Sequence, residues 1–464
     1  MKKFGFKDQI GYVFGDMAGS FVNLYVESFF LVYCTYVMGI TPAFMGTFFI
    51  FSRIWDAIND PLIGSLPDRW KIGKTGDKFK PYIRVGMIPL AVAGMLAFAP
   101  VYNLPLTARH IIVCVAYVLV DMTYTLTSMP YGSLVSVITT DPVERTKLSR
   151  ARSIGGMIVG MGFLSFVPQF IFDKNSNPIP DMFFKVAFVF GLLSIIFYLG
   201  LLFCTTERVK TASANETHEK FNYWEVIRGC LKNRPLIGAM VATVGSLISI
   251  TGGSAIRTYM FKEYYHDARI LTAVSLSSLP VIILCFILVP ILVKKFGKRK
   301  TLLGACIPAL VVSAFLFIVP IPNVWLYFAL SIIGNMGNSV FTILVWSLVA
   351  DCIDFQEYQT HDRKDGSVFS VFGFARKIGS AIASAISAYA LGWVGFVAGQ
   401  TQQTQEVANN IRTLATFIPL LTAVLMLIGI GLIFNLTKED SEKITEELQK
   451  RHAKKMAQNA AQKQ

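Results

Sequence analysis

Apolar runs of about 20 residues recur along the whole chain, and each is long enough to cross the ~30 Å hydrocarbon core of a membrane as an α-helix. Short polar stretches separate these runs. We predict twelve spans, at 10–38, 42–66, 82–103, 108–138, 150–172, 183–205, 236–261, 270–293, 301–319, 323–350, 367–396 and 409–436. The pattern therefore predicts an all-α membrane protein with twelve transmembrane helices.

The loops that follow the second and eighth spans are similar to one another. The stretch GSLPDR at 64–69 is followed by Gly73-Lys74, and PILVKK at 290–295 is followed by Gly297-Lys298. The two copies lie 226 residues apart, close to half of the 464-residue chain. We therefore predict two pseudo-symmetric bundles of six helices, at 1–205 and 235–437, with a cytoplasmic linker at 206–234 and a tail at 438–464. Internal repeats of this kind are typical of transporters whose site lies between the repeats.

Composition supports membrane insertion, and the distribution of charge predicts the topology. The chain is 53% hydrophobic and only 16% charged, whereas roughly a quarter of the residues of a soluble protein are charged. The net charge of +14 raises the possibility of nucleic-acid binding, but 33 of the 43 Lys and Arg residues lie at the N-terminus, after even-numbered spans or in the tail. The opposite loops hold only Arg109, Lys174, Lys262, Arg269 and Arg412. Because excess Lys and Arg mark the cytoplasmic side, we expect a multi-pass protein of the cytoplasmic (inner) cell membrane, with both termini cytoplasmic and no nucleic-acid partner.

Enzymatic and cofactor motifs do not emerge from the sequence. The seven cysteines have no paired spacing, and none of the five histidines falls in the middle of a predicted span. Gly73-Lys74-Thr75 resembles the end of a phosphate-binding loop, but Asp68 stands where that motif requires its first glycine. We therefore expect neither an enzyme nor a bound cofactor.

The second span carries two acids on one helical face. Asp56 and Asp60 are four residues apart, and Asn59 lies beside them. A charge at the centre of a bilayer costs at least ~2.5–3.5 kcal/mol, so such residues usually mark an ion or substrate path. Two carboxylates and an amide are suitable ligands for a small hard cation. The alternative is a structural pair in which each acid is satisfied by a neighbouring arginine.

Several motifs together resemble one transporter family. The loop at 64–69 is similar to the G-x-x-x-D-R signature of the major facilitator superfamily. Within that superfamily, the chain resembles the glycoside–pentoside–hexuronide:cation symporters from about residue 11 to 434. The stretches that carry this resemblance are Gly15-Asp16, Arg53 with WDAINDP at 55–61, KFKP at 78–81, TYT at 123–125, PYGSL at 130–134 and DCIDFQEY at 351–358.

The resemblance implies the roles of individual residues. It makes Asp56, Asn59, Asp60 and Thr125 the cation ligands. It places Asp16, Arg152 and Lys377 at the sugar, where charged groups can each bind two hydroxyl oxygens. An ion pair between Asp16 and Arg152 is the structural alternative, and it is compatible with sugar binding if the pair opens.

The chain departs from the family's galactoside carrier at the sugar site. Ser128 occupies the position of a second sugar-binding carboxylate, and Gly132 that of a stacking tryptophan. Tyr124 could stack on a sugar ring, although packing is the more common role of an aromatic residue in a span. The loss of one acid suits an acidic sugar such as a hexuronide, but neutral glycosides and pentosides remain open.

Charged residues at the cytoplasmic ends of spans are candidates for gating. These are Asp68, Arg69, Asp351, Asp354 and Glu357. Ion pairs that close an inner gate are one interpretation, and a solvated helix end is the other.

Taken together, the sequence predicts a secondary active symporter that takes up a glycoside, pentoside or hexuronide with sodium or a proton by alternating access. We expect it to function as a monomer in the lipid bilayer. An uncoupled sugar facilitator or a transporter-like sugar sensor is the alternative. An uncoupled protein, however, has no need for two buried acids in the second span.

Overall fold

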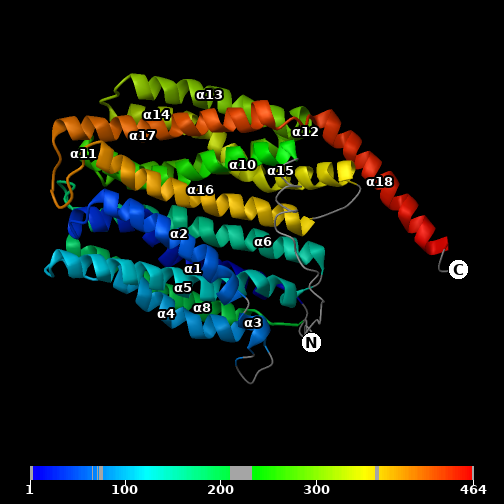
Figure 1. Cartoon of the computed structure of the whole chain (residues 1–464), viewed down its shortest axis with the longest axis horizontal. Coiled ribbons are helices and arrows are strands. Elements are labelled where there is room, and N and C mark those ends of the chain that lie inside the picture. The colour runs from blue at the N-terminus through cyan, green and yellow to red at the C-terminus, as the bar shows by residue number, and fades with distance from the viewer. Residues whose placement is uncertain are drawn as a thin grey trace. The chain divides into compact units, whose positions relative to one another are not determined.

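The structure is a computed structural model that describes residues 4–64, 66–70, 72, 77–139, 141–208, 233–360 and 365–461 (Figure 1). Regular structure in these residues is helical, apart from one isolated β-bridge between Phe172 and Pro178. The first half of the chain contains α1 (Phe6–Val32), η1 (Tyr33–Val37), α2 (Pro42–Gly64), α3 (Leu66–Arg69), α4 (Lys80–Ala97), α5 (Leu106–Ile138), α6 (Pro142–Met157), η2 (Ile158–Phe163), α7 (Leu164–Ile171) and α8 (Pro180–Cys204).

The second half contains α10 (Arg234–Leu247), η3 (Ile248–Gly252), α11 (Gly253–Glu263), α12 (Ile270–Phe296), α13 (Lys298–Ile318), α14 (Val324–Gly334), α15 (Met336–Thr360), α16 (Asp365–Trp393), α17 (Gln405–Met426), η4 (Leu427–Ile433) and α18 (Lys438–Ala461). The elements η1 to η4 are short π-helical segments. The predicted span at 323–350 is interrupted at Asn335 and continues to Thr360, because α15 extends beyond the apolar stretch.

Nine helical segments in the described residues are long and apolar enough to cross a membrane. They are Phe6–Val37, Leu106–Ile138, Lys147–Ile171, Pro180–Cys204, Arg234–Glu263, Ile270–Phe296, Lys298–Ile318, Val324–Thr360 and Gln405–Ile433. Helices α2, α4 and α16, of 23, 18 and 29 residues, lie where three more spans are predicted. The all-α membrane class is confirmed, and the count of twelve spans stays a prediction.

The chain divides into two compact units. Unit 1 comprises Met1–Thr217, Ala255–Ser277 and Ala385–Ile411, and unit 2 comprises His218–Ser254, Ser278–Ser384 and Arg412–Gln464. Unit 1 therefore contains the helices of the first half together with parts of four helices from the second half, α11, α12, α16 and α17. The predicted boundaries at 205, 234 and 437 stay predictions.

Helix α1 is the centre of unit 1 and packs on α8, α6 and α4. Its buried face is rich in aromatic residues: Phe21 lies 5.3 Å from Phe190, and Tyr25 lies 4.4 Å from Phe98, between ring centroids. Close approach to α6 depends on Gly155, where a Cβ atom would lie 2.5 Å from the carbonyl oxygen of Val13. Gly155 therefore lets the backbones of α1 and α6 meet.

Two carboxylates, those of Asp8 and Glu207, form hydrogen bonds near the starts of α1 and α4. Asp8 is buried and forms two 2.9 Å bonds with the guanidinium of Arg208. The carboxylate of Glu207 accepts bonds from the backbone N–H groups of residues 78–80, at 2.7, 2.9 and 2.9 Å. The first N–H groups of a helix have no partner within the helix, and Glu207 satisfies that of Lys80, the first residue of α4, together with those of the two residues before it.

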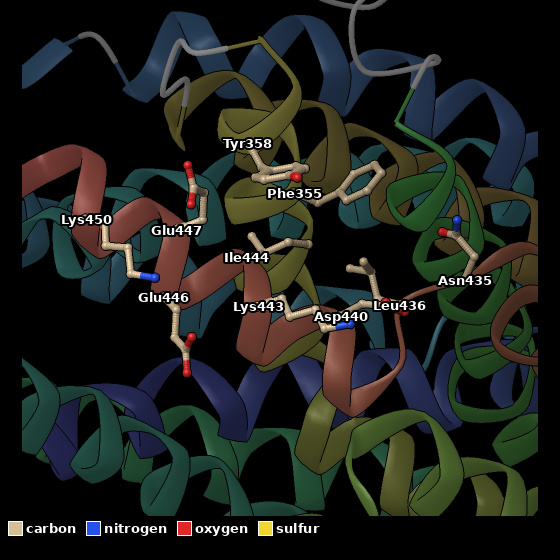
Figure 2. A pocket seen from close by; sticks show the side chains of 10 residues that line it. All are labelled: Phe355, Tyr358, Asn435, Leu436, Asp440, Lys443, Ile444, Glu446, Glu447 and Lys450. Carbon is tan, nitrogen blue, oxygen red and sulfur yellow. The ribbon is translucent and has the colours of Figure 1, made fainter.

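Unit 2 has an apolar core built by α10, α13, α15 and η4, which the C-terminal helix α18 extends with Ile444 and Leu448. Thr437 begins α18 with a capping box: its N–H and hydroxyl donate to Asp440, whose own N–H donates back to the Thr437 hydroxyl. A groove of about 560 Å³ runs between α18 and the end of α15, where Phe355 and Tyr358 form part of its wall (Figure 2). The tail is therefore a helix docked on unit 2.

Candidate functional site

Helices α2 and α5 of unit 1 face one another with rows of polar side chains. On α2, Ser52, Asp56 and Asp60 are spaced by four residues, so they lie on one face. On α5, Asp121 and Thr125 have the same spacing. Two hydrogen bonds connect the rows: the Ser52 hydroxyl donates to Asp121 Oδ2 at 2.8 Å, and the Thr125 hydroxyl donates to Asp60 Oδ1 at 2.9 Å.

Asp56 lies between these two connections and pairs with an arginine. Its Oδ2 atom accepts a bond from Arg53 at 3.2 Å, one turn earlier on the same helix. Asn59 is 4% exposed, and its Nδ2 group has no hydrogen-bond partner among the described residues. The structure thus brings Asp60 and Thr125 together as the resemblance implies, while Asp56 adopts the arginine-paired arrangement that the sequence analysis gave as the alternative.

Two acids that the sequence analysis did not assign belong to this region. Asp121 on α5 lies within electrostatic reach of Arg53 and Asp56, and Glu27 on α1 lies within reach of Arg53 and Asp121. The signal that could have identified them is the one used for Asp56, an acidic side chain inside a predicted span. The cluster therefore draws carboxylates from α1, α2 and α5.

The predicted sugar residues of unit 1 meet where α1 crosses α6. Arg152 Nε donates to Asp16 Oδ1 at 3.2 Å, and the Arg152 guanidinium lies over the ring of Tyr131 at 5.3 Å. The Arg152 side chain is 47% exposed, whereas that of Asp16 is 18% exposed. A Cβ atom at Gly156 would lie 2.9 Å from Asp16 Oδ2. Nearly half of the Arg152 side chain is therefore accessible to a ligand.

The other three predicted sugar residues lie on α5 and α16, and Tyr124 is within electrostatic reach of Asp16 and Arg152. Tyr124 and Ser128 lie one turn apart on α5, and the Tyr124 ring is 3.3 Å from where a Cβ atom of Gly19 would be. Tyr124 therefore packs closely against α1. Lys377 is exposed on α16 in unit 2, while its neighbour Arg376 lies over the Trp346 ring at 5.1 Å. The two adjacent bases thus have different environments, as expected from their spacing.

The predicted gating residues are only partly described. Asp351 on α15 binds Lys298, the first residue of α13, with both carboxylate oxygens at 2.7 and 2.8 Å. Asp354 and the buried Glu357 follow on the same helix. The side chains of Asp68 and Arg69 lie outside the described residues. A gating role for this set stays a prediction.

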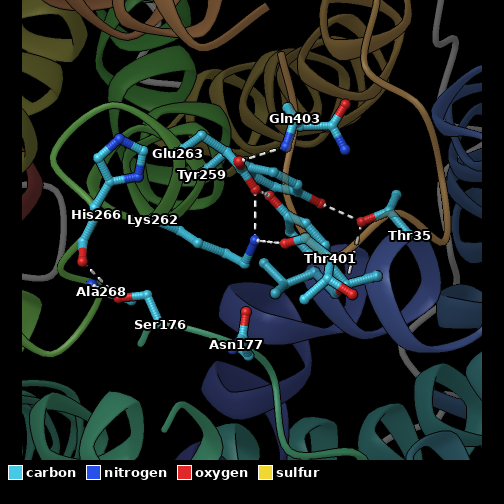
Figure 3. Close-up of polar contacts among 12 residues, drawn as sticks. Thr35, Ser176, Asn177, Tyr259, Lys262, Glu263, His266, Ala268, Thr401 and Gln403 are labelled. Carbon is cyan, nitrogen blue, oxygen red and sulfur yellow. Dashed lines mark hydrogen bonds and ion pairs between the residues drawn. The ribbon is translucent and has the colours of Figure 1, made fainter. Parts of the chain in front are cut away.

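Lys262, which the sequence analysis counted among the loop residues, is instead buried near the end of α11. Lys262 and Glu263 are 4% and 3% exposed and are joined at 2.5 Å. Glu263 also accepts bonds from the Tyr36 hydroxyl at 2.7 Å and the Gln403 N–H at 2.9 Å, and Lys262 donates to the carbonyl oxygen of Thr401 (Figure 3). The sequence placed the end of this helix two residues too early, and it gave no indication of the loop that covers the pair.

Comparison with known proteins gives the family. The family model described as MFS/sugar transport protein matches residues 11–438. The chain is 29% identical to the putative glycoside/cation symporter YagG of Escherichia coli, over 98% of this chain and 97% of that protein. It is 28% identical to the glucuronide carrier protein homolog of Escherichia coli, over 88% of each chain.

A solved structure shows the same fold. The structure of a D-xylose-proton symporter superposes with a TM-score of 0.66 at 11% identity, and it covers 94% of this chain and 98% of that one. This confirms the predicted major facilitator fold. The protein is a multi-pass membrane transporter and not an enzyme, and it belongs to the MFS/sugar transport protein family.

Proposed function

We propose that the protein is a secondary active symporter that couples entry of a monovalent cation to uptake of a sugar or glycoside. Sodium is the favoured coupling ion, and a proton is the alternative. The observation that carries this proposal is the pair of hydrogen-bonded rows on α2 and α5. Asp60 bonded to Thr125, with Asp56 one turn away on α2 and the buried Asn59 beside Asp60, supplies hard oxygen atoms inside a membrane span.

The composition of this set favours an alkali ion over a tightly held metal. In the described part of the chain, no three His, Cys, Asp or Glu side chains converge closely enough to hold a metal ion. Hydroxyl and amide oxygens from Thr125 and Asn59 would therefore complete the shell. A weakly held, readily released ion is what a symporter needs as cargo. The name of the similar glycoside/cation symporter of Escherichia coli supports the same assignment.

The sugar site that we propose is formed by Asp16 and Arg152, with Tyr124 and Ser128 on α5 and Lys377 on α16. Asp16 is the acceptor for sugar hydroxyls, and Arg152, whose side chain is half-exposed, is the donor. With two bases and one acid, the set suits a hexuronide or another acidic sugar. Similarity to a glucuronide carrier homolog is in keeping with this charge balance.

We also propose a membrane topology with cytoplasmic termini and a gate at the cytoplasmic side. The distribution of Lys and Arg supports cytoplasmic termini in the inner cell membrane, and six-helix halves at 1–205 and 235–437 would alternate access around the site. The Lys298–Asp351 pair would belong to a cytoplasmic gate with Asp354, Glu357 and the Asp68-Arg69 loop. We propose that a single chain carries out transport.

Transport into proteoliposomes tests the function. Purified protein would be offered radiolabelled hexuronides, pentosides and glycosides under an inward sodium gradient, an inward proton gradient, or no gradient. We expect accumulation above equilibrium with sodium for at least one sugar. Asp60→Asn should abolish accumulation, while Asp181→Asn, at the start of α8, serves as the matched acid control. Accumulation driven by protons alone would assign the proton as coupler, and simple equilibration under every gradient would refute symport.

A further inference from the structure

One guanidinium in the α2–α5 region faces more carboxylates than it binds. Arg53 lies within electrostatic reach of Glu27 on α1, Asp56 on α2 and Asp121 on α5. Among the described residues, its hydrogen bond is to Asp56, at 3.2 Å. Three acids against one base leave excess negative charge in a membrane span, where each charge is costly. The pairing seen here is therefore one of several that the same groups could adopt.

Asp121 is held beside Arg53 with one oxygen occupied. The hydroxyl of Ser52, the residue before Arg53, donates to Asp121 Oδ2 at 2.8 Å, and Ser52 itself is buried. Among the described residues, Asp121 forms no ion pair, and its Oδ1 atom accepts no hydrogen bond. Ser52 thus holds the Asp121 carboxylate beside the helical turn that carries Arg53. The Oδ1 atom of Asp121 can still accept a hydrogen bond.

Sodium binding by Asp56 would disturb the present pairing. A carboxylate that coordinates an ion gives up part of its interaction with a neighbouring guanidinium, and a partly buried guanidinium without an acid is strongly unfavourable. Arg53 then needs a second acid on a neighbouring helix. Glu27 is exposed, whereas Asp121 is partly buried and anchored by Ser52. Asp121 is therefore the acid best placed to receive the guanidinium.

We propose that Asp121 is a positioning residue for the coupling ion: when sodium takes the carboxylate of Asp56, Arg53 exchanges Asp56 for Asp121. The proposal rests on the proposed cation site of Asp56 and Asp60. The exchange conserves charge, since one ion pair is replaced by another and sodium neutralises the released acid. It also ties ion binding to the contact between α2 and α5.

The exchange predicts a defined loss of sodium affinity. In Asp121→Asn, Arg53 has no charged acceptor on α5, so it competes with sodium for Asp56. Loss of one charge-assisted hydrogen bond corresponds to a fall in affinity of about 10-fold to 100-fold. Asp121→Glu retains the charge and should restore most of the affinity. Asp181→Asn, an acid at the start of α8, should leave it unchanged.

A double-variant cycle separates exchange from direct coordination or a general structural role. Arg53→Gln removes the competitor, so sodium affinity should stay equal or become tighter. In that background, Asp121→Asn should have almost no further effect, because there is no guanidinium to receive. Sodium affinity would be measured calorimetrically, by titrating NaCl into purified full-length protein in choline chloride without sugar. Melting temperatures of all variants would establish that each one is folded.

The outcomes distinguish this inference from the proposed function. A large loss in Asp121→Asn that disappears in the Arg53→Gln background supports the exchange. The same loss in both backgrounds would show that Asp121 acts on the ion directly, and unchanged affinity in Asp121→Asn would also overturn the exchange. If Asp60→Asn abolishes sodium binding in either case, the cation site stands. If Asp60→Asn binds sodium normally, or the unsubstituted protein binds none, the proposed sodium site and this inference both fail.

Discussion

The buried pair of Lys262 and Glu263 gives the strongest stability prediction. Glu263→Gln keeps the shape of the side chain but removes its charge. Among the described residues, the buried ammonium of Lys262 then keeps the Thr401 carbonyl oxygen as its acceptor but loses the acid to which it is bonded. Breaking a buried ion pair by removing one partner costs roughly 3–5 kcal/mol. We expect Glu263→Gln to lower the free energy of unfolding by about that amount.

The contacts around Lys262 and Glu263 determine how much stability each substitution in this cluster removes. The Glu263 carboxylate accepts three bonds, from Tyr36, Lys262 and the N–H of Gln403. Tyr36→Phe removes one bond to a charged group, a loss of about 1.5–3 kcal/mol. The cation–π contact, in which Lys262 lies 4.2 Å from the Tyr36 ring centroid, survives that change. Lys262→Met should cost about as much as Glu263→Gln, because it strands the other charge.

The assay is reversible unfolding of the purified protein in mixed detergent micelles, with a double-variant cycle. Lys262→Met combined with Glu263→Gln removes both charges, so its cost should be at least about 2 kcal/mol below the sum of the two single variants. Tyr102→Phe, which removes an exposed 3.1 Å bond to Asp181, is the matched control and should change stability by less than about 0.5 kcal/mol. Strict additivity of the two single variants, or a Glu263→Gln variant as stable as the control, would refute the reasoning.

Three other predictions concern helix contacts and ends. Gly155→Val should force α6 away from α1, lower the free energy of unfolding by about 1–3 kcal/mol and weaken sugar binding. Gly162→Val is the control, because no atom lies within 4 Å of a Cβ at residue 162. This variant should bind sugar normally in calorimetry. Glu207→Gln weakens the cap on α4 and should cost about 1–3 kcal/mol in micelle unfolding, and an unchanged unfolding curve would contradict the cap. Hydrogen bonds from Thr437 lower the pKa of Asp440, so the cap stabilises α18 above about pH 4 and is lost as the pH falls further. Hydrogen exchange of α18 should therefore be faster in Thr437→Val than in the unsubstituted protein at pH 7. This difference should become smaller near pH 3. A difference of the same size at both pH values would count against the cap.

The helices could be predicted from the sequence because membrane insertion imposes a simple rule. A span must be apolar over about 20 residues, since hydrocarbon cannot satisfy polar side chains. Their interruptions could not be predicted in the same way. The π-helical segment η2, at Ile158–Phe163, lies inside an unbroken apolar run, and hydropathy does not distinguish its hydrogen bonds from those of an α-helix. The end of α11 was missed because Lys262 and Glu263 are charged, and only their mutual pairing makes burial tolerable.

In the cation site, too, some features follow from the sequence and others require the fold. The spacing of Asp56, Asn59 and Asp60 follows directly from helix geometry, and Thr125 follows from the family resemblance. The bond between Ser52 and Asp121 did not follow from the sequence, because the partner of a side chain on α5 depends on how α2 and α5 are rotated against one another. The same dependence determines that Asp56 binds Arg53 here. Periodicity within one helix is available from the sequence, whereas contacts between helices require the fold.

Helix α1 supplies a physical connection between the two proposed sites of unit 1. Asp16 and Glu27 are eleven residues apart, which is close to three turns, so they lie on the same face of α1 about 16 Å apart along its axis. Asp16 pairs with Arg152 at the proposed sugar site, and Glu27 lies within electrostatic reach of Arg53. Tyr124 on α5 is within reach of Asp16 and Glu27, and it directly precedes Thr125. A shift of charge at Arg53 would therefore act on α1 and on Tyr124, both of which also belong to the proposed sugar site.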